Sequence, residues 1–167
     1  MEIPICKREI SLFKGDDFIS AAYIIVENGI KKVRYAVYDG VEWTSESILT
    51  KEISEEVKSV SLVEDGAGNP YVLVGLFDGV HAYYRGDFWI FLNNTIISDF
   101  VMELDSSYDS INNSIHLAYS DGYEVKYQRF DVDTSKFLSN YEFIDFDSSS
   151  VSIAVTSLGE PIISYAH

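Results

Sequence analysis

The sequence predicts an all-β protein made of repeated four-stranded antiparallel sheets, and three observations support this fold class. Aromatic residues are abundant, with 12 Tyr and 10 Phe among 167 residues, and aromatic side chains favour pleated strands. No long segment carries apolar residues at helical spacing. Short apolar segments alternate with turns rich in Gly, Asp and Asn, such as "DGAGNP" and "YSDGY".

The chain is most simply one domain, residues 1–167, because this length suits a single hydrophobic core. Cys6 is the only cysteine, so neither an intrachain disulfide nor a cysteine-based zinc site can form. The N-terminal "MEIPICKREI" lacks the features of a signal peptide, and no segment approaches the ~20 apolar residues of a membrane span. The compartment therefore stays open.

Two segments far apart in the chain repeat one pattern. "SVSLVEDGAGNPYVLV" begins at Ser59 and "SVSIAVTSLGEPIISY" begins at Ser150. Both start with Ser-Val-Ser-apolar, and both continue with Gly-x-Pro at the same offset, so that Gly68 and Gly159 lie 91 positions apart. That interval suits two repeats of about 45 residues each.

The repeats are approximately residues 8–50, 57–98, 99–146 and a partial copy at 148–167. The second repeat is the clearest. Its four expected strands are Ser59–Asp65, Tyr71–Phe77, Val80–Arg85 and Phe88–Asn93. In its second strand, "YVLVGLF", the residues that alternate to each side are all apolar or Gly, which predicts a sheet buried on both faces.

Four-stranded repeats of 40–50 residues are typical of β-propeller blades, so we expect a β-propeller with about 3.5 blades per chain. A β-sandwich also contains many short antiparallel strands and is the alternative architecture. The constant register of the 91-residue repeat favours the propeller.

The repeat pattern, which runs Ser-Val-Ser-apolar, Gly-x-Pro, Asp-Gly and then Trp, resembles those of sialidase-like and lectin-like propellers over nearly the whole chain. The sialidase Asp-box, Ser-x-Asp-x-Gly-x-x-Trp, is absent, so the resemblance implies the fold and not the enzyme. We therefore predict a non-enzymatic binding or assembly module with a glycan or protein ligand. The alternative is a closed small propeller or a fragment of a sialidase-like glycoside hydrolase.

The fourth repeat contains only its first two strands, which leaves a blade edge open. A second copy of the chain could complete it, and a dimer is the favoured homo-oligomer. The segment Glu2–Lys7 could instead close a four-bladed ring, or a longer chain could supply the remaining blades.

The formal charge of -15 and the pI near 4.3 argue against nucleic-acid partners and against anionic membrane surfaces. Three arginines, Arg34, Arg85 and Arg129, fall in or just after third strands and could clamp a ligand carboxylate. Asp87 and Asp131 each follow an arginine by two residues, so local ion pairs are the expected structural role.

Trp43 and Trp89 follow the third strands of the first two repeats. They could stack on a sugar or, as the more ordinary role, pack between blades. His81, His116 and His167 show no metal-ligand spacing and are expected to be ordinary strand residues.

The segment "DVDTSKFLSNYE" places oxygen ligands at calcium-loop positions. These ligands are Asp131, Asp133, Ser135, Ser139 and Glu142. The sharp turn at position 6 favours Gly, but Lys136 stands there, so an ordinary polar turn is the competing interpretation and no other cofactor is expected.

Overall fold

A computed structural model describes residues 10–15, 18–48, 57–92, 100–146 and 150–166, with the side chains of 139 and 140 excepted. Within these residues the chain forms fourteen β-strands and no helix. Accordingly, no helix in this part of the chain is long and apolar enough to cross a membrane.

The strands form three four-stranded antiparallel sheets and one two-stranded sheet, which we call blades 1 to 4 in chain order. Blade 1 contains β1 (Ile10–Lys14), β2 (Ile19–Glu27), β3 (Ile30–Tyr38) and β4 (Trp43–Ser47). Blade 2 contains β5 (Ser59–Glu64), β6 (Pro70–Leu76), β7 (Gly79–Arg85) and β8 (Trp89–Phe91). Blade 3 contains β9 (Glu103–Asp109), β10 (Ser114–Ser120), β11 (Glu124–Asp131) and β12 (Lys136–Phe146). Blade 4 contains β13 (Ser150–Val155) and β14 (Pro161–Ala166).

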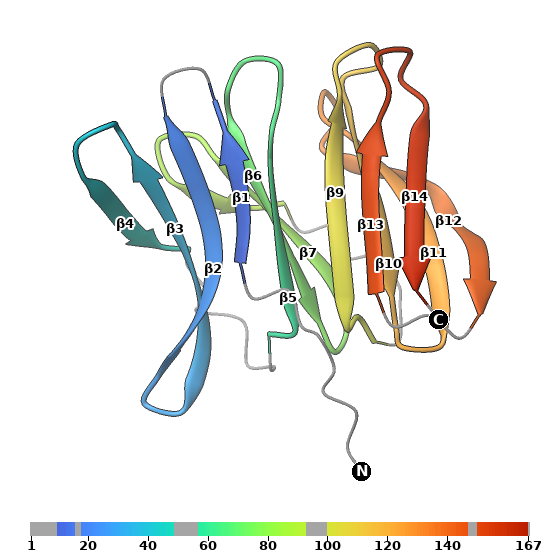
Figure 1. Cartoon of the computed structure of the whole chain (residues 1–167), viewed down its shortest axis with the longest axis horizontal. Coiled ribbons are helices and arrows are strands. Elements are labelled where there is room, and N and C mark those ends of the chain that lie inside the picture. The colour runs from blue at the N-terminus through green and yellow to red at the C-terminus, as the bar shows by residue number, and fades with distance from the viewer. Residues whose placement is uncertain (1–9, 16–17, 49–56, 93–99, 147–149, 167) are drawn as a thin grey trace.

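Each blade is an up-and-down meander in which neighbours in the chain are neighbours in the sheet. The first strands of successive blades lie side by side, β1 against β5, β5 against β9 and β9 against β13 (Figure 1). These strands therefore form the inner edge of the array, and the fourth strands form its outer edge. This is the predicted β-propeller arrangement, and about 3.5 blades are present.

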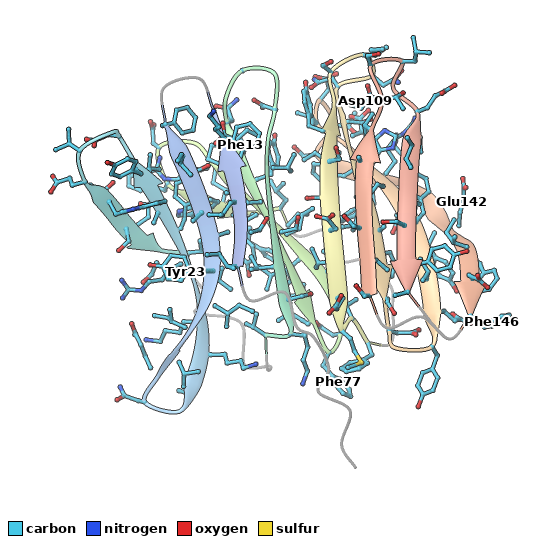
Figure 2. All side chains as sticks on the ribbon, in the orientation of Figure 1. Phe13, Tyr23, Phe77, Asp109, Glu142 and Phe146 are labelled. Carbon is cyan, nitrogen blue, oxygen red and sulfur yellow. The ribbon has the colours of Figure 1, made fainter. Side chains whose placement is uncertain are left out.

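The core consists of three hydrophobic clusters, one between each pair of adjacent blades, and side chains fill the spaces between the sheets (Figure 2). Blade 2 lies between two of them. Val72, Val74 and Leu76 pack toward blade 1, whereas Tyr71 and Leu73 pack toward blade 3. The alternation expected for this strand is therefore confirmed, with both faces buried.

The repeated Gly-x-Pro pattern marks the turn between the first and second strands of a blade. Gly68 and Gly159 have φ angles of +80° and +79°, a left-handed conformation that glycine adopts without steric cost. Pro70 and Pro161 then begin β6 and β14. The turns are fastened by a side-chain oxygen that accepts backbone N–H groups, from Asp65 in blade 2 and from Thr156 in blade 4.

The strands of blade 2 begin and end within two residues of their predicted bounds. The expected strand Glu2–Lys7, Asn93 and His167 lie outside the described residues.

Candidate functional site

A groove of about 340 Å³ opens between blades 1 and 2, near the outer strands. It is lined from blade 1 by Tyr35, Val37, Thr44, Ser45 and Glu46, and from blade 2 by Pro70 and Arg85. The lining includes the aromatic Tyr35 and the aliphatic Val37 and Pro70, and its two charged residues come from different blades. An apolar surface with a few polar groups is the usual make-up of a small-ligand site.

Arg85 and Glu46 join the two walls. Arg85 Nε donates to Glu46 Oε1 at 2.5 Å, and Arg85 Nη2 donates to Glu46 Oε2 at 3.3 Å, so the guanidinium engages both carboxylate oxygens. Both side chains remain about one-third or more exposed, at 35% and 40%. Each therefore presents further hydrogen-bonding capacity to a ligand in the groove.

Trp89 contacts the carboxylate of this pair. Its indole Nε1 donates to Glu46 Oε1 at 3.1 Å. Its ring meets Tyr35 edge-on, with centroids 5.2 Å apart and planes at 70°. Burial raises the pKa of Tyr35, so its hydroxyl stays protonated. Trp89 thus holds Glu46 toward the groove and belongs to the core between blades 1 and 2.

The register positions of Tyr35 and Glu46 can be compared with those of the next two blades. Glu46 lies opposite Tyr35 in the ladder between β3 and β4. The same register holds Ala82 and Leu92 in blade 2. In blade 3 it holds Tyr127 and Glu142, so that blade repeats the phenol and the carboxylate.

The two tryptophans follow equivalent third strands, but their environments in the structure differ. Trp89 is 8% exposed and packs between blades, which is the ordinary role we expected as the competing interpretation. Trp43 is 52% exposed at the start of β4 and contacts the Tyr38 ring, with centroids 5.4 Å apart. Trp43 does not line the groove.

The three arginines lie on the third strands of three different blades. Arg34 pairs with Glu27 at 2.9 Å. The local pair expected between Arg85 and Asp87 is replaced by the pair with Glu46 across the blade interface. Arg129 acts on its neighbour Asp131, whose pKa is lowered first by hydrogen bonds from Thr134 and least by the arginine. In the described structure, Arg34 and Arg85 thus each pair with a glutamate, and the three-arginine clamp stays a prediction.

The described residues of the predicted calcium loop belong to a hairpin, and the side chain of Ser139 lies outside the described residues. Asp131 and Lys136 close an ordinary hairpin between β11 and β12, in which Asp131 accepts hydrogen bonds from the backbone and hydroxyl of Thr134. Asp133 accepts from Asn113 at 2.6 Å, and Ser135 has a φ of +53°. Glu142 lies within β12 opposite Tyr127, four residues along β11 from Asp131, or about 13 Å at strand rise. Within the described residues, no group of three or more His, Cys, Asp or Glu is placed to hold a metal ion.

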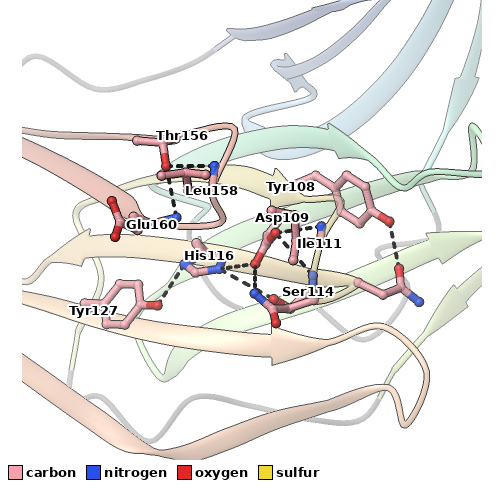
Figure 3. Close-up of polar contacts among 11 residues, drawn as sticks. Tyr108, Asp109, Ile111, Ser114, His116, Tyr127, Thr156, Leu158 and Glu160 are labelled. Carbon is pink, nitrogen blue, oxygen red and sulfur yellow. Dashed lines mark hydrogen bonds and ion pairs between the residues drawn. The ribbon is translucent and has the colours of Figure 1, made fainter.

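Blade 3 contains a buried polar network around His116 (Figure 3). His116 Nε2 lies 3.3 Å from Asp109 Oδ2, and the Tyr127 hydroxyl lies 2.8 Å from His116 Nδ1. Burial lowers the pKa of His116, which favours a neutral ring that donates through Nε2 to Asp109 and accepts from Tyr127. Burial alone would raise the pKa of Asp109, but hydrogen bonds from Asn112 and the Ile111 backbone outweigh it and lower that pKa.

This network is structural. Both His116 and Asp109 are buried, so a substrate has no access to them. Asp109 fastens the turn between β9 and β10, because it accepts from the backbone of Ile111 and from the side chain of Asn112. The turn containing Gly159 packs on Asp109, where an added Cβ would lie 3.1 Å from the carboxylate. The network therefore supports the contact between the blade 4 turn and blade 3.

Comparisons with known proteins address the fold. No family model matches the chain, and no curated protein sequence matches it. Three solved structures with similar folds are a protein of unknown function from Dyadobacter fermentans, a fucose lectin from Kordia zhangzhouensis in complex with methyl-fucoside, and a Trypanosoma rangeli sialidase in complex with the inhibitor DANA.

The Dyadobacter structure has a TM-score of 0.65 and 12% identity over 95% of this chain and 56% of its own. The lectin has a TM-score of 0.53 and 12% identity over 83% of this chain and 99% of its own. The sialidase has a TM-score of 0.61 and 15% identity over 95% of this chain and 34% of its own. The chain thus spans about half the Dyadobacter protein and a third of the sialidase.

At these identities the likeness shows the fold alone, which is the sialidase-like and lectin-like propeller fold that the repeats predicted. The sequence drew attention to Arg85 and Trp89 but not to Glu46 and Tyr35. Glu46 was missed because comparison with the clearest repeat, blade 2, gives no hint of a carboxylate at this position. The equivalent residue of blade 2 is the apolar Leu92.

Proposed function

We propose that the chain is a non-enzymatic propeller module that binds a neutral carbohydrate in the groove between blades 1 and 2. The observation that carries the proposal is the exposed Arg85–Glu46 pair in a groove whose lining includes the Tyr35 ring. Sugar hydroxyls both donate and accept hydrogen bonds, so a carboxylate and a guanidinium side by side suit them. An aromatic ring such as that of Tyr35 suits the apolar face of a pyranose ring.

The charges favour a neutral ligand over an acidic one. Glu46 already neutralises Arg85, and the whole chain carries a formal charge of -15. An anionic sugar would be repelled by this field and would find no unpaired cation in the groove. The similarity in fold to a fucose lectin in complex with methyl-fucoside adds support for a carbohydrate as the ligand class.

The two tryptophans provide a direct test by NMR, because the chain contains only Trp43 and Trp89. Titration with neutral methyl glycosides, including methyl-fucoside, should shift the indole N–H signal of Trp89, whose proton points to Glu46. The Trp43 signal should stay in place. A methyl monosaccharide is expected to bind with a Kd of about 1 mM.

Two variants locate the binding. Arg85→Ala should weaken binding at least about tenfold, since it removes a charge-assisted hydrogen bond. Arg34→Ala is the matched control, because Arg34 is a similarly exposed third-strand arginine paired with Glu27 away from the groove. If neutral sugars leave the Trp89 signal unmoved, or if both variants bind equally well, the proposal is wrong.

A further inference from the structure

Neighbouring blades are joined by a repeated hydrogen bond at their inner strands. In each case a side-chain oxygen on one first strand accepts the backbone N–H of the next first strand. The three bonds are Leu62 N–H to Ser11 Oγ at 3.0 Å, Ser106 N–H to Ser61 Oγ at 3.1 Å, and Ile153 N–H to Asp105 Oδ2 at 3.0 Å. Every described junction between blades uses it.

These bonds define equivalent positions in the four blades. Ser11, Ser61 and Asp105 are the acceptors of blades 1 to 3, and Ser152 holds the same position in blade 4. Leu62 is a donor residue, and Leu12 holds its position in blade 1. Blade 4 therefore offers an acceptor toward a following blade, and blade 1 offers an N–H toward a preceding one.

The face of blade 1 that a preceding blade would cover is apolar and exposed. Leu12 is 63% exposed, whereas its equivalent Leu62 is 5% exposed. Ile10 is 57% exposed, whereas its equivalent Val60 is fully buried. The difference arises because blade 1 covers the face of blade 2 in this structure.

The opposite face of blade 4 is exposed in the same way. Ile162 is 60% exposed, whereas its equivalent Tyr71 is 4% exposed against blade 3. Ser152 is also exposed, although its hydroxyl already donates to Asp105 at 2.8 Å. A hydroxyl that donates one bond can still accept another. Ser61 Oγ does both toward blade 3, because it donates to Asp105 and accepts the Ser106 N–H.

We propose that the exposed face of blade 4 docks on the exposed face of blade 1 of a second copy of this chain, with Ser152 Oγ accepting the Leu12 N–H. The same contact made in both directions closes two chains into a ring with twofold symmetry. The occupant is a second copy because the contact requires a blade face with an acceptor at the Ser152 position and apolar residues beside it. The chain carries both that face and its complement.

The expected assembly has twice the chain mass of 18.9 kDa by analytical ultracentrifugation at micromolar concentration. Two chains of formal charge -15 repel one another, so the dimer should become tighter as salt is added. Leu12→Glu and Ile162→Glu should each give monomers, because each places a carboxylate in an apolar contact. Val41→Glu, on the exposed turn between β3 and β4, is the matched control and should remain dimeric.

Mixing the two monomeric variants tests the direction of the contact. A Leu12→Glu chain keeps its blade 4 face and an Ile162→Glu chain keeps its blade 1 face, so a one-to-one mixture retains one intact contact and should form heterodimers. Circular dichroism should show unchanged strand content in both variants, because both positions are exposed.

A wild-type chain that stays monomeric at every concentration and salt level overturns the proposal, as does a dimer unaffected by both variants. Failure of the mixture to associate would overturn the head-to-tail contact. The groove between blades 1 and 2 lies elsewhere, so sugar binding and dimerisation can fail separately.

Discussion

Blades 1 and 2 have the same four-stranded meander, yet residues at the same register positions differ in environment. Leu62 and Trp89 of blade 2 are buried, whereas Leu12 and Trp43 of blade 1 are exposed. Local sequence does not separate the members of either pair, since each pair has one residue type. What differs is whether a neighbouring blade covers that face. In a repeat protein, burial is therefore a property of the junction and not of the repeat.

The largest expected difference is between the two tryptophans. Trp89→Ala should cost about 3–5 kcal/mol of unfolding free energy, because it empties a packed site between blades. Trp43→Ala should cost less than about 1.5 kcal/mol, since mainly its contact with Tyr38 is lost. Urea unfolding followed by circular dichroism measures both. Equal costs would mean that the two sites are covered alike in solution.

The leucine pair provides the same comparison with no change of residue type. Leu62→Ala should destabilise the fold by about 2–5 kcal/mol. Leu12→Ala should change stability by no more than about 0.5 kcal/mol under conditions where the chain is monomeric. Chemical denaturation at low chain concentration separates the two values. A large cost for Leu12→Ala in the monomer would show that this face is already covered within one chain.

A glycine position compares blade 2 with blade 4. Gly75 faces Ser59 in the ladder, and an added Cβ would lie 2.5 Å from the Ser59 hydroxyl and 2.9 Å from Val101. The equivalent position of blade 4 holds Ala166, which is exposed. Gly75→Ala should therefore cost about 1–3 kcal/mol through overpacking. Thermal unfolding gives the measurement, and Ala166→Gly, as the reverse change, should alter the midpoint little.

The smallest expected effect is a pH dependence at the junction between blades 3 and 4. The pKa of His116 is lower in the folded protein than its ordinary value of 6.5, so the unfolded chain binds more protons there. Stability from this group is thus full above pH 6.5 and declines as the pH falls below it, by at most about 1.4 kcal/mol per pH unit. His116→Gln should flatten this decline between pH 7 and 5, as measured by urea midpoints. An unchanged slope would exclude His116 as its source.

Much of the fold could be predicted because short sequence patterns identify each strand and turn of the repeat. Gly68 and Gly159 mark equivalent left-handed turns, and the apolar residues on both sides of "YVLVGLF" indicated a sheet covered on both faces. The site was less accessible. Arg85 and Trp89 stood out by type and place, but their partner Glu46 lies about 40 positions earlier in the chain, on another blade.

Two local arrangements considered from the sequence do not occur among the described residues. The spacing in "DVDTSKFLSNYE" suits a calcium loop only if the chain coils around one point, but a hairpin carries Glu142 away along β12. The pair expected between Arg85 and Asp87 likewise assumed a neighbour in sequence, whereas the blade interface supplied Glu46. At Arg85 a nonlocal contact thus replaced the local one.

By itself, the sequence determined the strands, their turns and the four-stranded repeat, since these depend on alternation, on glycine conformation and on short-range hydrogen bonds. The tertiary structure decided which copy of each repeated residue is buried and which side chains share the groove. Those properties depend on how adjacent blades face one another, and contacts between blades join residues about 40 positions apart. No local pattern in the chain encodes such a contact.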